Sequence, residues 1–162
     1  MTYRLARVTA GDLAARRDEL LALCAQAFCG DPWHEPPLGA VRTVDRLLGS
    51  AGGKDGFTAV AALDAEEALL GFSAGWTDTV LSGAASAFEL AELVVAPGHQ
   101  GQGIGRRLHD ELLLGAAPGP ALLMTLDVPE LTDRYTGWGW TVVDRQRPGK
   151  ELRDYVVMHR AR

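Results

Sequence analysis

Apolar and polar residues recur along this chain in two periods, one typical of strands and the other of helices. Runs rich in strand-forming residues, bounded by turn residues, predict strands at 3–8, 57–63, 68–76, 88–95, 121–128, 140–145 and 154–160. Apolar residues three or four positions apart predict helices at 13–28, with Asp12 as its cap, at 38–50 and from about 103. A short helix can follow the strand at 121–128.

The order of these elements predicts the architecture. The two strands at 57–63 and 68–76 are joined by the acidic turn DAEE, which predicts an antiparallel hairpin. The strand at 88–95, the helix after it and the strand at 121–128 form a βαβ unit, so those two strands should be parallel. We therefore expect one α/β domain over residues 1–162, with a mixed central sheet of six or seven strands and helices on both faces.

Composition narrows the classes of function. The 162 residues suit a single domain, and the net charge of −5 disfavours a phosphate-backbone partner, so no nucleic acid is expected. No apolar run approaches the roughly 18 residues of a membrane helix, and the N-terminus does not resemble a signal peptide, which favours a cytoplasmic protein. Cys24 and Cys29 do not have metal-ligand spacing, the histidines are isolated, and His109 is expected at the surface, so no metal is predicted.

The segment GHQGQGIGRR, residues 98–107, is the strongest chemical signal. It lies between a predicted strand and a predicted helix, where unpaired backbone N–H groups and the helix dipole attract anions. A lysine-dependent phosphate loop is excluded because Ile104 and Gly105 follow Gly103. A dinucleotide-binding turn would use Gly101 and Gly103, but Arg106 stands in place of its third glycine. That class, a nucleotide-dependent oxidoreductase, stays as an alternative.

A third pattern is QxxGxG, formed by Gln100, Gly103 and Gly105 and preceded by LVVAP. This combination resembles the acyl-CoA signature of the GNAT family of N-acetyltransferases, and the order of elements is similar over nearly the whole chain. Near the end, YTGWGW resembles the YxxxGF motif of the family, with Tyr135 as its tyrosine. The resemblance implies transfer of an acetyl group from acetyl-CoA directly to a primary amine of a small molecule or protein, and it allows a homodimer.

The resemblance also implies how the cofactor is held. The pyrophosphate of coenzyme A would bind the backbone amides from Gly101 to Arg106, and the pantetheine arm would run along the preceding strand like an added strand. The cofactor-binding residues implied in this way are Leu93, Val94, Val95, Gly101, Gln102, Gly103, Ile104, Gly105 and Arg106.

Three carboxylates are candidates for the general base that the amine requires. Strand periodicity places Glu89 and Glu92 on opposite faces of the strand, each among apolar residues that would raise its pKa. Glu89 is placed first because some family members carry their base at a similar position; Glu92 is second, and Asp127 at the end of the next strand is third. At least two of the three must serve a structural role.

The resemblance assigns Tyr135 as the acid that protonates the departing thiolate. Asp127 and Tyr135 are only eight residues apart, so the helix between them is short. A protein that binds acyl-CoA as a sensor without catalysis is therefore another alternative.

The resemblance implies that the acceptor amine binds near the loop DPWHEPP, which lies between the first two predicted helices. Trp33 could pack on the acceptor and Glu35 could pair with its charge. The loop is equally consistent with a proline-stiffened connection whose tryptophan covers the core. The sequence does not choose among acceptors.

Overall fold

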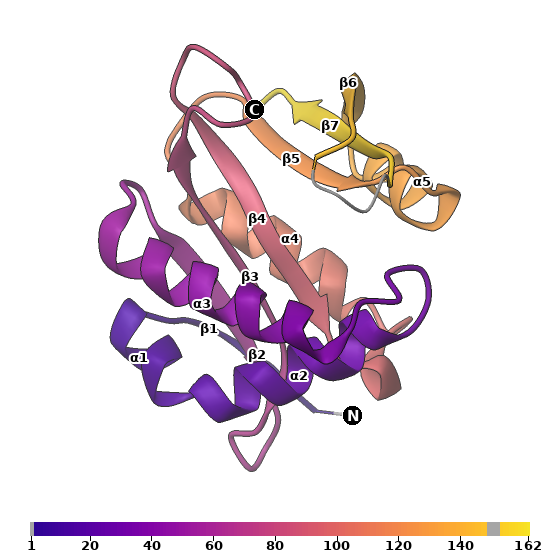
Figure 1. The fold of residues 1–162 in the computed structure, drawn as a ribbon. Helices are drawn as coiled ribbons and strands as arrows, with labels where there is room; N and C mark the ends of the chain where they lie inside the picture. Colours follow the sequence, from indigo (N-terminus) through magenta and orange to yellow (C-terminus); the bar gives the residue numbers. More distant parts are fainter. Residues whose placement is uncertain (1, 149–152) are drawn as a thin grey trace.

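The computed structural model describes residues 2–148 and 153–162, whose strands form one mixed sheet in the order β1-β2-β3-β4-β5-β7-β6 (Figure 1). The seven strands are β1 (Arg4–Arg7), β2 (Thr58–Leu63), β3 (Leu69–Asp78), β4 (Ala87–Val95), β5 (Ala121–Leu126), β6 (Thr141–Gln146) and β7 (Tyr155–Arg160). They match the strands predicted from the sequence. A mixed sheet of this order is not the doubly wound parallel sheet of a dinucleotide-binding protein.

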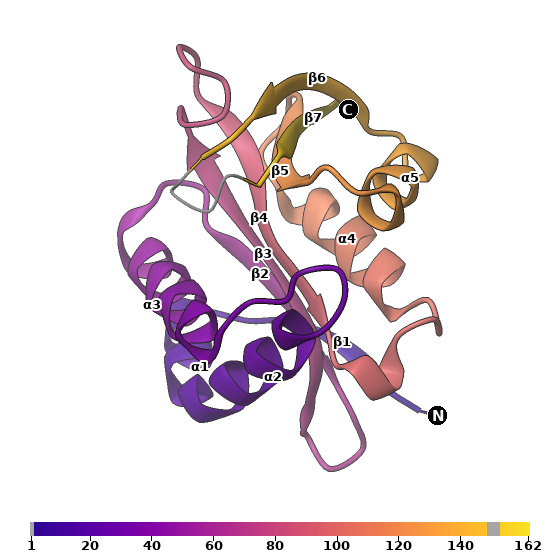
Figure 2. The ribbon, with the colours of Figure 1, turned by 45° about the vertical axis from the view of Figure 1, so that its right-hand side comes forward.

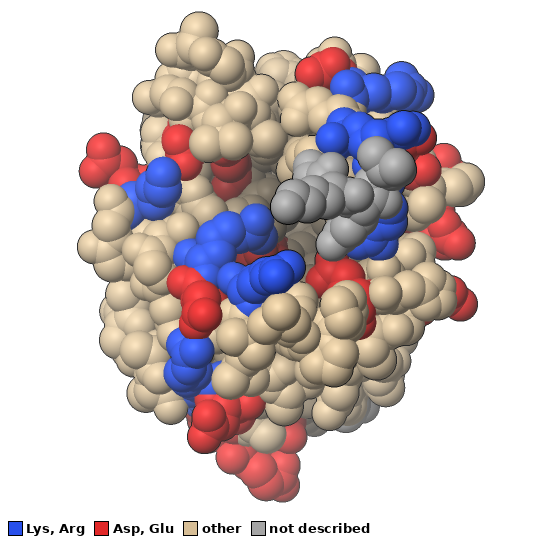
Figure 3. Space-filling model, in the orientation of Figure 1, with Lys and Arg blue, Asp and Glu red and all other residues tan. Residues whose placement is uncertain are grey.

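The helices are α1 (Ala10–Ala15), α2 (Arg17–Cys29), α3 (Pro37–Gly53), α4 (Ile104–Gly115) and α5 (Pro129–Gly137), with a 3₁₀ turn, η1, at Pro97–His99. Figure 2 shows α1, α2 and α3 on one face of the sheet and α4 and α5 on the other. Each face has its own apolar core: Leu20, Val44 and Phe72 belong to the first, and Ile104, Leu108 and Trp140 to the second. On the α3 face, lysine and arginine side chains lie beside a hollow (Figure 3).

The prediction of one helix over 13–28 capped by Asp12 is wrong in two respects. The helical segment is divided at Arg16 into α1 and α2, so three helices rather than two separate β1 from β2. The N-cap is Thr9, whose hydroxyl accepts from the Asp12 N–H at 3.1 Å while the Asp12 carboxylate accepts from the Thr9 N–H at 2.8 Å. Asp12 is thus the third residue of a capping box, which satisfies two free N–H groups at the helix start.

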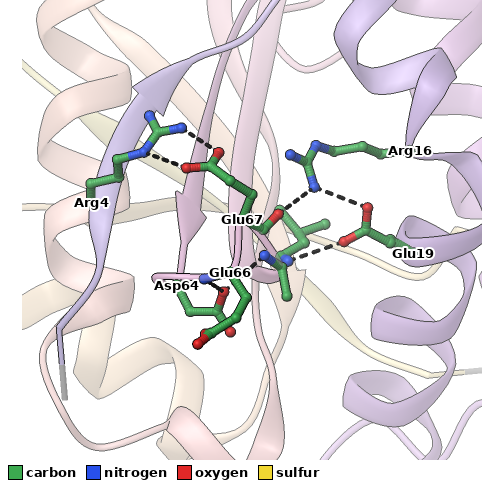
Figure 4. A network of polar contacts seen from close by, with 8 residues as sticks. Arg4, Arg16, Glu19, Asp64, Glu66 and Glu67 are labelled. Atoms are coloured by element: carbon green, nitrogen blue, oxygen red, sulfur yellow. Dashed lines mark hydrogen bonds and ion pairs between the residues drawn. The ribbon is translucent and has the colours of Figure 1, made fainter.

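Charged residues fix the turn between β2 and β3 to the N-terminal elements (Figure 4). Arg4 of β1 pairs with Glu67 of the turn, and Arg16 donates to the Glu67 carbonyl and to Glu19. Glu19 in turn accepts from the N–H of Leu69 at the start of β3 at 3.1 Å. The hairpin is antiparallel, as predicted, and these contacts join it to β1 and to the junction of α1 and α2.

Strands β4 and β5 are parallel, as the βαβ unit predicts, but they pair only at their beginnings. The register pairs Phe88 with Ala121 and Glu89 with Leu122, and no later pairs join the two strands in the part of the chain that the structure describes. The edge of β4 that faces β5 is therefore free from Leu90 onward. In β-sheets such a free edge can bind another extended chain.

A β-bulge in β4 changes which side chains share a face. In the pairing of β3 with β4, Ala74 lies opposite Glu92 and Gly75 opposite Leu90, so Ala91 has no partner. Cross-strand partners point to the same face, and Ala74 belongs to the core beneath α1 to α3, as does Trp76, the partner of Glu89. Glu89 and Glu92 thus share the α3 face, and the prediction that they lie on opposite faces is wrong.

No helix among residues 2–148 and 153–162 has the length and apolar character needed to cross a membrane.

Candidate active site

The glycine-rich segment forms a loop that leads from η1 into α4. Gly101 and Gly103 have φ angles of 76° and 83°, in the left-handed region that glycine adopts without strain, and Gly103 is the N-cap of α4. No side chain caps this helix. Within the described chain, the backbone N–H groups from Gly101 to Arg106 donate to no acceptor, and the first bond of the helix runs from Arg107 to the Gly103 carbonyl. These groups form a cradle for an anion.

A pocket of about 400 Å³, which we call the loop pocket, lies against this cradle. Its lining includes most of the residues that the sequence assigned to the cofactor, namely Leu93, Val94, Val95, Gly101, Gly103, Gly105 and Arg106. Gln102 and Ile104 are not in the lining: the Ile104 side chain is buried in the core and Gln102 is exposed, which leaves only their backbone amides available.

Two polar side chains hold the loop pocket in shape. The side-chain amide of Gln100 donates to the carbonyl of Val95 at 3.0 Å, which ties the loop to the end of β4. The Arg106 Nε donates to both carboxylate oxygens of Asp110, at 3.0 and 2.9 Å, and its guanidinium lies 5.5 Å from the ring centroid of Trp138. Arg106 is thus fixed in the pocket wall by its own helix and by Trp138.

A second pocket of about 640 Å³, which we call the larger pocket, lies between α3 and the sheet. It corresponds to the face on which Figure 3 shows basic side chains beside a hollow. Charged residues of both signs line it: Glu35, Asp78, Glu89 and Glu92 are acidic, and Arg42, Arg46 and Lys54 are basic.

Glu89 lies in the larger pocket with 6% of its surface exposed. Its Oε1 accepts from the backbone N–H of Leu81 at 3.2 Å, and no cation pairs with it among the described residues. Burial raises the pKa of the Glu89 carboxyl above its usual value of 4.5, and the hydrogen bond from Leu81 opposes this shift only in part.

Glu92 has the same exposed fraction of 6% but lies deeper, and Arg46 of α3 forms an ion pair with it. Burial raises the pKa of the Glu92 carboxyl, and the charge and hydrogen bond of Arg46 act in the opposite direction. The two glutamates thus differ in their partners: Glu92 is neutralised by a cation, whereas Glu89 is held by a neutral N–H group.

The two pockets meet, because Phe28, Trp33, Leu93 and Tyr135 line both. Tyr135, on α5, is 7% exposed and lies edge-on to Trp138 and Trp140, with ring centroids 5.6 and 6.3 Å away. Burial raises the pKa of the Tyr135 hydroxyl to about 12, so it carries its proton at neutral pH. Tyr135 is therefore part of the wall that the two pockets share.

The remaining predicted residues are divided between this site and the surface. Trp33 and Glu35 line the larger pocket; Trp33 packs edge-on to Phe28 at 5.4 Å, and Glu35 lies 3.7 Å from Arg153. Asp127 lines neither pocket, and its carboxylate lies 3.4 Å from the Nε of Arg145.

His109 is a buried residue that the sequence placed at the surface, and this prediction is wrong. Trp140 donates its indole N–H to the His109 Nε2 at 2.9 Å, and the Nδ1 lies 2.7 Å from Asp110. Since an indole N–H can only donate, Nε2 is the acceptor and the proton is on Nδ1. In the sequence, the signal for its burial is that His109 directly follows Leu108, which lies on the apolar face of α4.

The model of the Acetyltransferase (GNAT) family matches residues 19–120 of the chain. The chain belongs to this family of acetyltransferases. The comparison with curated proteins found no match.

Solved structures share the fold over the full chain at low identity. An acetyltransferase described as of the GNAT family from Desulfovibrio desulfuricans is 18% identical, with a TM-score of 0.69 and 99% of each chain covered. The PaiA N-acetyltransferase of Thermoplasma acidophilum, in complex with coenzyme A, is 15% identical, with a TM-score of 0.63 and 100% of each chain covered. NAA60 of Arabidopsis thaliana, in complex with a bisubstrate analogue, is 12% identical, with a TM-score of 0.68 and 99% of each chain covered.

Proposed function

We propose that this protein is an N-acetyltransferase that passes an acetyl group from acetyl-CoA directly to a primary amine. The observation that carries the proposal is the junction of the two pockets at Tyr135 and Leu93. One pocket offers an anion cradle and a free strand edge, and the other holds two buried carboxylates. A donor and an acceptor bound in these pockets would meet at their shared wall.

The chain's residues fit coenzyme A in two respects. The free N–H groups from Gly101 to Arg106 match a pyrophosphate, and a Cβ added at Gly101 or Gly103 would extend into open space of the kind that the phosphates need. The unpaired edge of β4 from Leu90 onward can bind the amides of a pantetheine arm beside Leu93, Val94 and Val95. The coenzyme A in the Thermoplasma structure supports the same donor here. When bound, acetyl-CoA supplies the thioester carbonyl.

We assign the general base to Glu89. An acceptor amine of ordinary basicity is protonated at neutral pH, and its ammonium must lose a proton before it can react. Glu89 has no cation against it, so its carboxylate can accept this proton directly or through a water molecule. Glu92 remains the second candidate because its ion pair with Arg46 stabilises the charged carboxylate and opposes uptake of a proton. Asp127 is the weakest of the three because it lies outside both pockets.

We assign the general acid to Tyr135. Its hydroxyl carries a proton over the whole neutral range, and the residue lines both pockets. Donation of this proton to the departing sulfur would avoid release of a free thiolate. The packing of the ring against Trp138 and Trp140 keeps the hydroxyl in place, which favours transfer in one geometry.

A free-thiol assay tests the proposal. Acetyl-CoA is incubated with a panel of primary amines, and thiol release is compared between wild type and Tyr135→Phe. We expect amine-dependent release by wild type and a loss of about a hundredfold in kcat for the variant, the lower range for removal of a general acid.

Each other result points to a specific alternative. Binding of acetyl-CoA without thiol release for any amine would identify an acyl-CoA sensor instead of an enzyme. If acetyl-CoA neither binds nor reacts, the assignment of the loop pocket to the cofactor is refuted.

A further inference from the structure

The α3 wall of the larger pocket carries three cations on one side. Arg42, Arg46, Ser50 and Lys54 are four residues apart, so they lie along one face of α3 and its C-terminal end, and all four line the pocket. Arg42 is exposed and the Arg46 side chain is 60% exposed, whereas Glu89 and Glu92 on β4 are buried. The pocket thus has an acidic floor and a basic rim, and Figure 3 shows this gathering of basic side chains over α3.

Most charges in the larger pocket neutralise one another. Lys54 lies 2.7 Å from Asp78, Arg46 pairs with Glu92, and Glu35 lies 3.7 Å from Arg153.

Two opposite charges are left over. Glu89 accepts only from a backbone N–H, and Arg42 has no hydrogen bond or ion pair with any residue that the structure describes. One unpaired anion on the floor and one unpaired cation at the rim are complementary to a ligand that carries a cation at one end and an anion at the other.

We propose that the acceptor is a primary amine that also carries an anionic group such as a carboxylate, with its ammonium directed to Glu89 and its anion bound by Arg42 at the rim. This inference rests on the proposed function. A guanidinium can bind a carboxylate through two parallel hydrogen bonds, which would orient the acceptor as well as attract it.

The same arrangement works against polycationic acceptors. A second ammonium group would lie near Arg42 and Arg46, where like charges repel it. Polyamines and other molecules with several amines should therefore be poor acceptors despite the acidic net charge of the whole chain.

The test compares acceptors that differ only in the charge of the distal group. Thiol release from acetyl-CoA is measured with ω-amino carboxylates of increasing length, with the corresponding amides and with diamines of equal length. A second arm uses short peptides with a free N-terminus that carry either glutamate or glutamine at the second position. The first arm represents a free amino acid and the second a peptide, and the arm with the larger preference identifies the source.

We expect kcat/KM for the best carboxylate to exceed that of its amide about tenfold, which is the range of one charged hydrogen bond at an exposed site. Arg42→Gln should remove this ratio and Arg42→Lys should keep part of it. Arg17 provides the control because it pairs with Asp45 outside both pockets, so Arg17→Gln removes the same charge and should leave the ratio unchanged.

The outcomes separate the inference from the function that it rests on. Faster reaction of the amides or diamines, or a carboxylate-to-amide ratio that survives in Arg42→Gln, would overturn the inference while acetyl transfer stands. If no amine releases thiol, the proposed function fails. Calorimetric binding of the carboxylates to the CoA-loaded protein then decides the inference alone, and equal affinity for carboxylate and amide would refute it.

Discussion

Glu89 and Glu92 share one face of β4, line one pocket and have the same small exposed fraction, but Glu92 lies deeper and their partners differ. The guanidinium of Arg46 stabilises the charged form of Glu92 directly. Glu89 accepts one hydrogen bond, from the N–H of Leu81, and Lys54, whose charge also acts on it, is paired with Asp78. A carboxylate without a cation gains more from taking up a proton. At the scale of the residue, α3 therefore distinguishes the two proposed bases, because it supplies Arg46 to one glutamate and not to the other.

The pH profile of kcat/KM should identify the base. Because burial raises the pKa of Glu89 above 4.5, activity should rise with pH through that elevated value as the carboxylate loses its proton. Glu89→Gln should abolish this rise of kcat/KM with pH and lower kcat/KM by about a hundredfold. Steady-state rates across pH 5–9 with one amine provide the measurement. If the rise with pH persists in Glu89→Gln but vanishes in Glu92→Gln, the general base is Glu92 instead of Glu89.

The loop before α4 offers a second test, at the scale of the element. An alanine at Gly103 would place a methyl group in the anion cradle, and its left-handed φ of 83° would cost about 1 kcal/mol of stability. Gly83, in the connection between β3 and β4, has a φ of 81° and equally open surroundings, but it lines neither pocket.

The two substitutions should therefore destabilise the fold similarly, and only Gly103→Ala should weaken acetyl-CoA binding. We expect a loss of about tenfold in affinity, the equivalent of one charged hydrogen bond. Calorimetric titration measures the affinity and thermal unfolding the stability. Equal affinity in the two variants would show that the cradle does not bind the cofactor.

The His109 contact joins α4 to the segment that follows α5. It connects the helix that begins at the glycine loop with Trp140, which packs against Tyr135. Burial lowers the pKa of His109 below 6.5. At pH values between this lowered pKa and 6.5, the imidazole is protonated in the unfolded chain but not in the folded chain, which favours unfolding. The contribution of the buried, neutral His109 to the free energy of unfolding is complete above pH 6.5 and is lost as the pH falls.

The variant His109→Gln lacks this titration. The difference in unfolding free energy between wild type and variant should shrink as pH decreases below 6.5, by at most about 1.4 kcal/mol per pH unit. Denaturant unfolding at pH 5.5, 6.5 and 7.5 measures it. Parallel dependence on pH in the two proteins would contradict a buried neutral His109.

For the molecule as a whole, the features that depend on local pattern could be predicted and those that depend on tertiary contacts could not. Strand positions, the hairpin and the parallel β4–β5 pair follow from periodicity, turn residues and the handedness of βαβ units. The division of the first helix at Arg16 involves neither glycine nor proline, and the bulge at Ala91 appears only in the pairing with β3.

The features of the candidate site also separate into those that the local sequence predicts and those that depend on tertiary contacts. The glycine loop was readable because its spacing is a local property of the backbone, and Tyr135 because it lies in a local motif. The shared face of Glu89 and Glu92, the cation against Glu92 and the unpaired Arg42 depend on how α3 packs over the sheet, which periodicity does not report.

The meeting of two separately lined pockets has a consequence for the order of events in the proposed reaction cycle. Because each pocket has its own lining apart from four shared residues, neither reactant has to leave before the other arrives. A chain with this geometry has no need to store the acetyl group on itself between two half-reactions. Initial rates measured against both reactants should then follow a sequential pattern, with intersecting lines, rather than the parallel lines of a ping-pong scheme.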